Sequence, residues 1–231
     1  KEKERRCAMT ATAISPARQL RKQYYGLKAP LSCLSHLPGA VFGLVGTALL
    51  IAWSYHKPWN CISLSLFGIS LVVCYGTSAF YHGMALPRPQ SRKLQRVDHA
   101  GIFFLIAGTA TPICTIVLPS RIGSMLMVMV WAAAIFGVNY SLRYQRVPRA
   151  YLAPACILVG CIAVLPYPIL LERLGRDGFD LLAGGGILYL ASGLVFHRKI
   201  KNYLVIAHLL QLPASAFHFV LYGWFVLPLN V

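Results

Sequence analysis

The sequence predicts an all-α integral membrane protein, a bundle of seven transmembrane helices with a cytoplasmic N-terminus and an extracytoplasmic C-terminus. Three observations indicate this fold. Of the 231 residues, 57% are hydrophobic and only 12% are charged, whereas soluble domains contain about a quarter charged residues. The apolar residues form blocks long enough to cross a hydrocarbon core of about 30 Å. The basic residues collect in alternate loops between those blocks.

Each expected span is an apolar block of about 20 residues. Proline marks several of the joints, as at Lys57-Pro58, Leu118-Pro119 and Val147-Pro148, because proline favours turns and helix starts. The seven spans are predicted at residues 37–55, 59–82, 98–118, 122–141, 151–171, 179–196 and 203–227. The chain therefore divides into a basic cytoplasmic N-terminal segment, 1–36, and a seven-span membrane domain, 37–231.

The distribution of lysine and arginine sets the orientation of the spans. Eighteen of the 22 basic residues lie in the N-terminal segment and in the loops after the second, fourth and sixth spans. Cytoplasmic loops carry such an excess, so these segments are expected on the cytoplasmic side. Because topology explains the net charge of +16, no nucleic-acid partner is predicted. We expect a multi-pass protein of the plasma membrane, with membrane lipids as partners.

Four polar side chains from three spans are predicted to meet in the inner leaflet. Ser78 and His82 lie four residues apart at the inner end of the second span, on one helix face. Asp98 begins the third span, and His208 falls about one and a half turns into the seventh. Ionisable groups are costly inside a bilayer and usually have a function there. The four residues are therefore a candidate functional site.

The residue types at this site suggest a metal. Two imidazoles and a carboxylate, from His82, His208 and Asp98, form a ligand set typical of catalytic zinc. Ser78 would then hold a ring nitrogen or a water molecule. Hydrolysis at such a centre would make Asp98 and Ser78 the catalytic residues.

Simpler roles are available for the same kinds of residue. Asp98 could pair with Arg92 or Arg96 in the basic inner zone. His36 is placed at the end of a span, where contact with lipid headgroups is sufficient. His218 lies ten residues beyond the site histidine of the same span, about 15 Å further along it. We expect His218 to be a packing histidine that is hydrogen-bonded within the bundle.

The sequence resembles the progestin and adipoQ receptor family, which includes the bacterial hemolysin III-like proteins. The resemblance is carried by "LSHLPGA" at 34–40, "SAFYH" at 78–82, "RVDHAGIFFLIAGTATP" at 96–112 and "LVIAHLLQLPASAFHF" at 204–219. It implies an intramembrane zinc site on the cytoplasmic side. His82 would be a ligand, Asp98 would position a water, and His208 would be the second histidine of an H-x3-H pair. This chain has Leu204 where the first histidine of that pair is expected.

The departure at Leu204 leaves two interpretations of the site. Either His82, His208 and Asp98 hold a weakened zinc site, or the scaffold has lost its metal. The resemblance implies a zinc-dependent hydrolase of a membrane-lipid amide, similar to ceramidase-like members. An alternative is a receptor or signalling scaffold that binds a lipid-like small molecule and has a structural or degenerate site. A hemolysin-like permeabilising protein is a third hypothesis, which spans that are apolar nearly all round do not favour.

Overall fold

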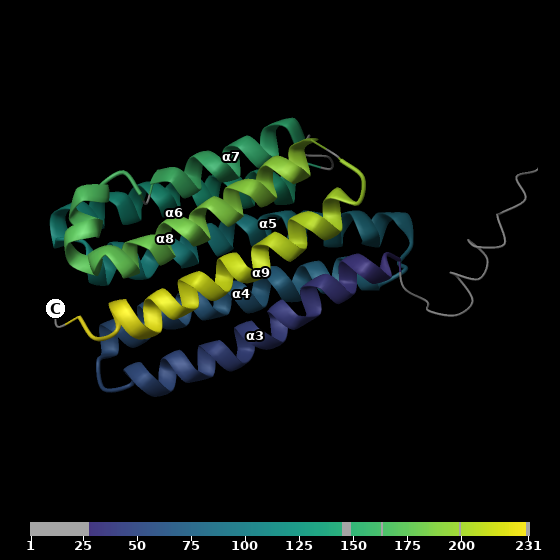
Figure 1. Cartoon of the computed structure of the whole chain (residues 1–231). Coiled ribbons are helices and arrows are strands. Elements are labelled where there is room, and N and C mark those ends of the chain that lie inside the picture. Colours follow the sequence, from purple (N-terminus) through teal and green to yellow (C-terminus); the bar gives the residue numbers. More distant parts are fainter. Residues whose placement is uncertain (1–27, 145–148, 163, 199, 230–231) are drawn as a thin grey trace, which may run out of the picture.

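The computed structural model describes residues 28–144, 149–162, 164–198 and 200–229. Seven α-helices in these residues pack as an elongated bundle (Figure 1), which confirms the predicted seven-helix fold. Most of the predicted basic segment lies in residues 1–27, outside the described part. The helices are α3 (Pro30–Ser54), α4 (Pro58–Gly83), α5 (Arg88–Pro112), α6 (Ser120–Arg143), α7 (Arg149–Ile162), α8 (Tyr167–Arg198) and α9 (Tyr203–Leu221). Two π-helices, η1 (Ile113–Val117) and η2 (Tyr222–Val226), continue α5 and α9.

Six helical segments of the described chain are long and apolar enough to cross a membrane. Their outward faces carry large apolar side chains, such as Leu44 on α3 and Phe136 on α6, which are 64% and 72% exposed. Helix α7 is shorter, with 14 residues, whereas about 20 are needed to span a bilayer core. The fifth predicted span, 151–171, is therefore too long, because the helix ends at Ile162.

Prolines explain where the predicted ends of the spans were wrong. Helix α3 begins at Pro30 and α5 begins at Arg88, seven and ten residues before the predicted spans. Proline is favoured in the first helical turn because its missing N–H costs nothing there. Pro166 separates α7 from α8, since the residue before a proline is disfavoured in the helical region. Gly175 then interrupts α8 with φ 67° and ψ 178°, a conformation that glycine adopts easily.

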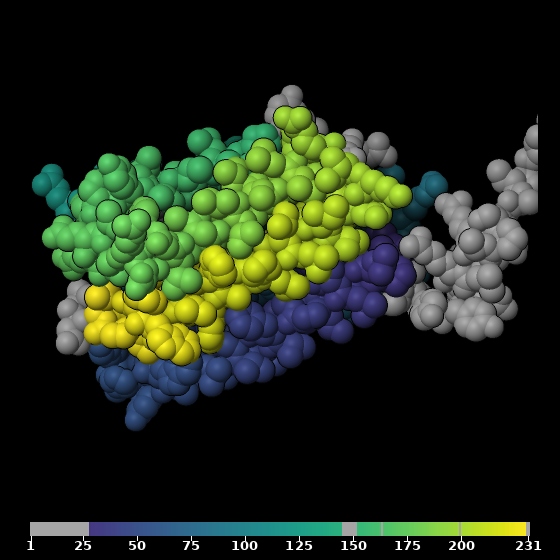
Figure 2. Space-filling view, in the orientation of Figure 1, coloured from purple at the N-terminus to yellow at the C-terminus, as the bar shows by residue number. Residues whose placement is uncertain are grey.

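Helices that are neighbours in sequence pack side by side, and the first of the described helices also contacts the last of them. Helix α3 lies against α4 and contacts α9, while α9 packs along α8; Figure 2 shows the yellow α9 between the green α8 and the blue-purple α3. A Cβ added at Gly39 would lie 2.7 Å from the Tyr75 ring, and one at Gly43 would lie 3.1 Å from Leu71. These glycines let α3 approach α4 closely, as small residues do between membrane helices.

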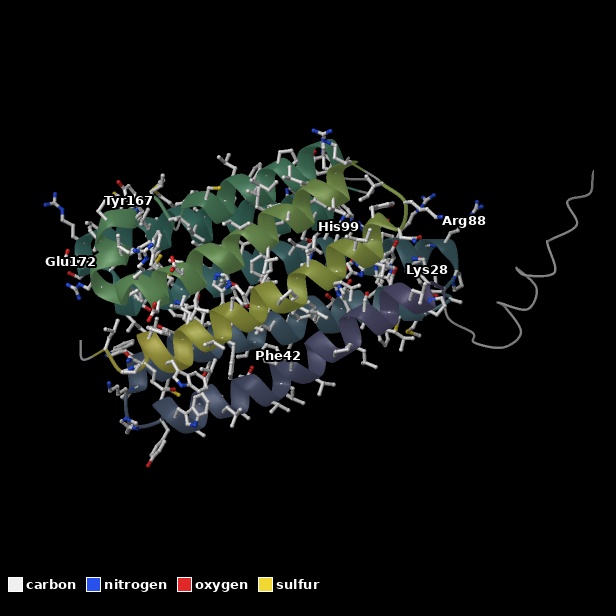
Figure 3. The ribbon with its side chains drawn as sticks, in the orientation of Figure 1. Lys28, Phe42, Arg88, His99, Tyr167 and Glu172 are labelled. Atoms are coloured by element: carbon white, nitrogen blue, oxygen red, sulfur yellow. The ribbon has the colours of Figure 1, made fainter. Side chains whose placement is uncertain are left out.

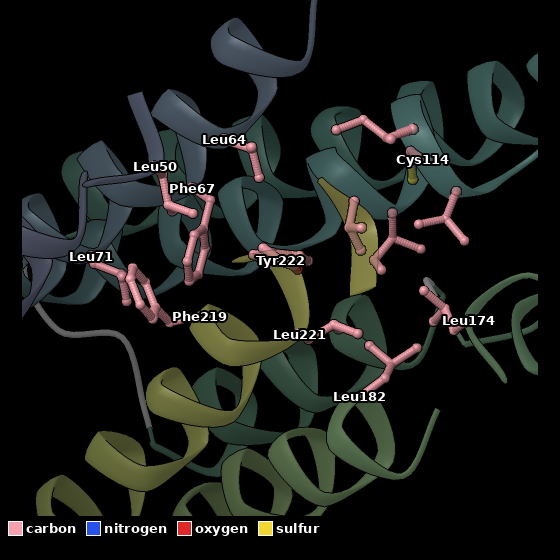
Figure 4. Close-up of a cluster of buried hydrophobic side chains, with 14 of the residues drawn as sticks. Leu50, Leu64, Phe67, Leu71, Cys114, Leu174, Leu182, Phe219, Leu221 and Tyr222 are labelled. Carbon is pink, nitrogen blue, oxygen red and sulfur yellow. The ribbon is translucent and has the colours of Figure 1, made fainter. Parts of the chain in front are cut away.

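A buried core fills the half of the bundle where α3 ends and α9 ends. Phe67 and Tyr222 are fully buried and meet edge to face with ring centres 4.7 Å apart. Leu50 and Leu71 are also buried there, and Phe219 packs between the helices (Figure 4). A second cluster joins α5, α6 and α7 through Phe103, Ala107, Ala110, Val130, Ala134, Leu152 and Val159.

The two ends of the bundle carry different chain segments and side chains. The start of α3, the α4–α5 connection and the start of α9 lie at one end (Figure 1). Lys28 and Arg88 lie at that end, and Tyr167 and Glu172 lie at the other (Figure 3). The end with Lys28 is the one predicted to be cytoplasmic, and this orientation remains a prediction. We refer to it below as the Lys28 end.

Candidate functional site

The structure brings His82 and His208 together at the Lys28 end. His82 is the penultimate residue of α4, and His208 lies in the second turn of α9. Their ring centres are 5.2 Å apart, and both side chains are buried. Two helices distant in sequence thus present imidazoles to the same interior point.

Ser78 and Asp98 form a second buried pair close by in the fold. Ser78 on α4 and Asp98 on α5 are neighbours, and they are 3% and 9% exposed. Ser78 lies one turn before His82 on the same face of α4. Asp98 is about three turns into α5 rather than at its start, because α5 begins at Arg88. A buried carboxylate is thereby fixed next to the helix face that carries His82.

Lys28 lies next to the site, in the chain segment that precedes α3. Its ammonium group lies 3.4 Å from the centre of the Tyr81 ring and donates to Ser91 at 3.1 Å. Burial lowers the pKa of Lys28, and the charge of Asp98 opposes that shift. Arg96, one of the predicted alternative partners of Asp98, instead donates to the Leu142 carbonyl at 2.9 Å.

Backbone hydrogen bonds attach this segment to the end of α4. The amides of Lys28 and Ala29 donate to the carbonyls of Gly83 and His82, at 3.1 and 2.8 Å. The start of α3 is therefore held beside His82.

Helix α3 also orients His208. The Ser35 hydroxyl donates to the Ser32 carbonyl at 2.9 Å, and its oxygen lies 3.1 Å from Nδ1 of His208. Because the single hydroxyl proton of Ser35 is used on Ser32, Nδ1 of His208 is the donor in the second bond. The proton on Nδ1 leaves the lone pair of Nε2 free, which is the form in which histidine binds metals.

His36 belongs to the same cluster, and the prediction that it only contacts headgroups was wrong. Its ring centre is 3.7 Å from that of His208 and 5.2 Å from that of Tyr75. The side chain is 2% exposed, and neither Nδ1 nor Nε2 has a hydrogen-bond partner. The predicted first span begins at residue 37 and excludes His36, whereas α3 begins six residues before His36, at Pro30. Its position within "LSHLPGA" was the available signal.

The described side chains do not form a ready-made metal site. In the described part of the chain, no group of three or more His, Cys, Asp or Glu side chains is arranged to hold a metal ion. The pair of His82 and His208 nevertheless has a suitable spacing. With a zinc–nitrogen distance of about 2.0–2.1 Å, two imidazoles on a tetrahedral zinc have ring centres about 5 Å apart. His36 adds to this cluster two ring nitrogens that have no hydrogen-bond partner in the described structure.

A polar network lies one layer deeper and connects α4, α8 and α9. The Tyr75 hydroxyl donates to the Gln211 carbonyl at 2.8 Å and lies 2.6 Å from the Ser215 hydroxyl, which is 2.7 Å from the Tyr189 hydroxyl. His218 is buried beyond it, with Nδ1 2.8 Å from the Ala214 carbonyl. The prediction that His218 is a hydrogen-bonded packing histidine is confirmed.

An apolar groove of about 550 Å³ lies beside the cluster, between α3 and α4. Its lining residues flank both His36 and His82 in sequence. They are Cys33, Leu37, Ala40, Gly76, Ala79, Phe80, Gly83, Met84, Ala85 and Leu86. Such a surface fits a hydrocarbon chain.

Comparisons with known proteins identify the relatives of this chain. The family model described as "Haemolysin-III related" matches residues 25–226. The chain is 30% identical over 188 residues to the "Hemolysin-3 homolog" of Bacillus subtilis (strain 168), covering 80% of this chain and 85% of that protein. It is 29% identical over 201 residues to "Hemolysin-3" of Bacillus cereus, covering 85% of this chain and 91% of that protein.

Proposed function

Because the chain belongs to the haemolysin-III related family and is an integral multi-pass membrane protein, we propose that it is a zinc-dependent hydrolase of membrane-lipid amides. The observation that carries this proposal is the 5.2 Å separation of the His82 and His208 rings. That separation is the one expected for two imidazoles sharing a tetrahedral zinc, about 5 Å. Zinc, when bound, polarises a carbonyl and lowers the pKa of a water.

The residues of the chain have distinct roles in this proposal. His82 and His208 would hold the metal, and the hydrogen bond that Nδ1 of His208 donates to Ser35 keeps the Nε2 lone pair of His208 available. Asp98 accepts a proton from the attacking water as general base. The water oxygen bonds to the amide carbon, the carbon–nitrogen bond breaks, and the proton passes from Asp98 to the leaving amine. Ser78, the neighbour of Asp98 on α4, would position the Asp98 carboxylate by donating a hydrogen bond to it.

The buried position of the site suits a lipid substrate. A lipid that arrives sideways keeps its acyl chain in an apolar environment, which the groove between α3 and α4 provides. The amide would then lie near the Lys28 end, where the polar side chains gather. A water-soluble amide would gain nothing from such a groove.

The experiment measures metal and activity on the same preparations. Purified protein in detergent should contain about one zinc per chain by elemental analysis, and His82→Ala should lose it. Asp98→Asn should abolish hydrolysis of a fluorescent ceramide in mixed micelles while the metal is retained. His197→Ala is the matched control, because His197 is exposed at the end of α8. Wild-type protein that holds no zinc after loading would contradict the proposal.

The printed names of the relatives refer to haemolysis, and this activity can be tested separately. The described helices turn large apolar side chains outward, whereas Asp98, His82 and His208 are buried in the interior. We therefore assign the activity to the cluster rather than to a pore. Dye release from liposomes at a low ratio of protein to lipid would favour permeabilisation instead.

A further inference from the structure

The Lys28 end of the described bundle carries exposed cations without exposed carboxylates. Lys28 and Arg88 are exposed there (Figure 3), and two more exposed basic residues follow in the second turn of α5. Asp98 is the only acidic residue in 28–144, and it is buried. The other acids of the described chain lie in the first half of α8, with Glu172 at the opposite end (Figure 3). The exposed cations at the Lys28 end are therefore available to an anion from outside the described chain.

Two of these cations flank one serine. The Lys28 ammonium donates to the Ser91 hydroxyl at 3.1 Å. Arg88 precedes Ser91 by three residues on α5, so both lie on the same side of that helix. Ammonium, guanidinium and hydroxyl groups are the side-chain donors that bind phosphate oxygens. The chemistry of this cluster therefore matches a phosphate group.

The apolar groove between α3 and α4 ends beside the same cluster. Leu86, which lines the groove, is two residues before Arg88. The Lys28 amide donates to the carbonyl of Gly83, another lining residue, at 3.1 Å. From Gly83 the lining follows α4 back to Gly76, a distance of about 10 Å at 1.5 Å per residue. A groove that is apolar along its length and has cations at its end matches a lipid with an anionic headgroup.

We propose that the groove, Lys28 and Arg88 together bind one phosphate-bearing lipid, with an acyl chain in the groove and the phosphate beside the two cations. The inference rests on the proposed function in taking the lipid to be an amide, and it adds that the headgroup carries a phosphate. Basic residues next to membrane spans attract anionic lipids. The groove adds contacts that a lipid held only by surface charge would lack. The substrate class is therefore a lipid amide with a phosphate headgroup.

A matched pair of lipids tests the headgroup. Native mass spectrometry of the full chain in a non-ionic detergent, with a zinc chelator present to prevent hydrolysis, measures the binding of ceramide phosphate and of ceramide with the same acyl chain. Ceramide phosphate should bind about 25-fold more tightly, because each of two basic residues near the headgroup contributes about fivefold. Arg88→Gln and Lys28→Gln should each reduce this preference about fivefold.

Arg121→Gln is the matched control for charge. Arg121 is exposed at the start of α6, where the chain has crossed the bundle along α5 to the opposite end (Figure 1). Its replacement should leave the preference for ceramide phosphate unchanged. Equal affinities of the wild type for the two lipids would overturn the proposal, and so would an equal loss of preference in Arg121→Gln and Arg88→Gln.

The groove is tested by filling it. A Cβ added at Gly76 would have no atom within 4 Å, so a larger side chain there occupies the groove without displacing a neighbouring helix. Gly76→Leu should lower the affinity for both lipids and leave their ratio unchanged. Gly160→Leu on α7, where an added Cβ also meets nothing within 4 Å, should change neither affinity. Wild-type affinities in Gly76→Leu would show that the lipid does not bind in the groove.

Lipid binding and metal content together separate this inference from the proposed function. If the wild type prefers ceramide phosphate but holds no zinc after loading, the lipid site stands and the proposed hydrolase fails. If the wild type holds zinc and hydrolyses ceramide but binds the two lipids equally, the hydrolase stands and the phosphate site is wrong.

Discussion

Replacing Tyr75 with phenylalanine should destabilise the bundle by a calculable amount. The Tyr75 hydroxyl donates to the Gln211 carbonyl and lies 2.6 Å from the Ser215 hydroxyl, while its ring is fully buried. Tyr75→Phe removes two bonds between α4 and α9 without changing the packing of the ring. Hydrogen bonds between membrane helices contribute about 0.6 kcal/mol on average and up to about 1.7 kcal/mol. The expected loss is therefore about 1–3 kcal/mol in total.

Thermal unfolding in detergent measures this loss. One kcal/mol lowers the melting temperature of a chain of this size by about 2–4 °C, so Tyr75→Phe should lower it by about 2–12 °C. Tyr55→Phe is the matched control, because Tyr55 is 74% exposed, and it should leave the melting temperature unchanged. Combining Tyr75→Phe with Tyr189→Phe should give less than the sum of the two effects, since both hydroxyls contact Ser215. A melting temperature equal to that of the wild type would refute this reading of the network.

Two further outcomes are expected. Gly68→Ala should destabilise the protein by about 1–3 kcal/mol, as overpacking does, because its Cβ would lie 2.1 Å from the Thr47 hydroxyl. Adding Thr47→Gly to this variant should recover most of the lost stability in a thermal melt. If it recovers none, the clash is not the cause of the loss. Ser35→Ala should weaken zinc binding about 10–100-fold in chelator competition, the usual effect of losing an outer-shell partner. Ser54→Ala, a buried serine at the far end of α3, should have no such effect, and equal affinities for both variants would contradict the role assigned to Ser35.

The number and type of the elements could be predicted from sequence because the bilayer imposes a simple requirement on composition. Each span must be apolar over most of its length, so hydropathy identified all seven helical regions. Hydropathy could not find the helix starts at Pro30 and Arg88, because the polar first turns of α3 and α5 lower the local average. It also could not place the break between α7 and α8 at the Leu165-Pro166 step, or the kink within α8 at Gly175.

The meeting of His82 and His208 could be anticipated because topology alone puts the end of one span and the start of another at the same end of the bundle. The contribution of α3 could not be anticipated in the same way. Ser35 and His36 contact a residue more than 170 positions away, and no local pattern encodes such a contact. Setting the first span seven residues too late also removed His36 from the membrane interior, where its lack of partners becomes informative.

The contact between α3 and α9 has a consequence for how the protein is made. Among the described helices, Ser35 and His36 enter the membrane with the earliest, α3, whereas His208 arrives with α9. During synthesis these polar side chains on α3 therefore lack their partner until α9 is inserted. A truncated chain without α9 would leave these imidazoles exposed to lipid. Membrane proteases that remove incomplete products could recognise the truncated chain by this exposure.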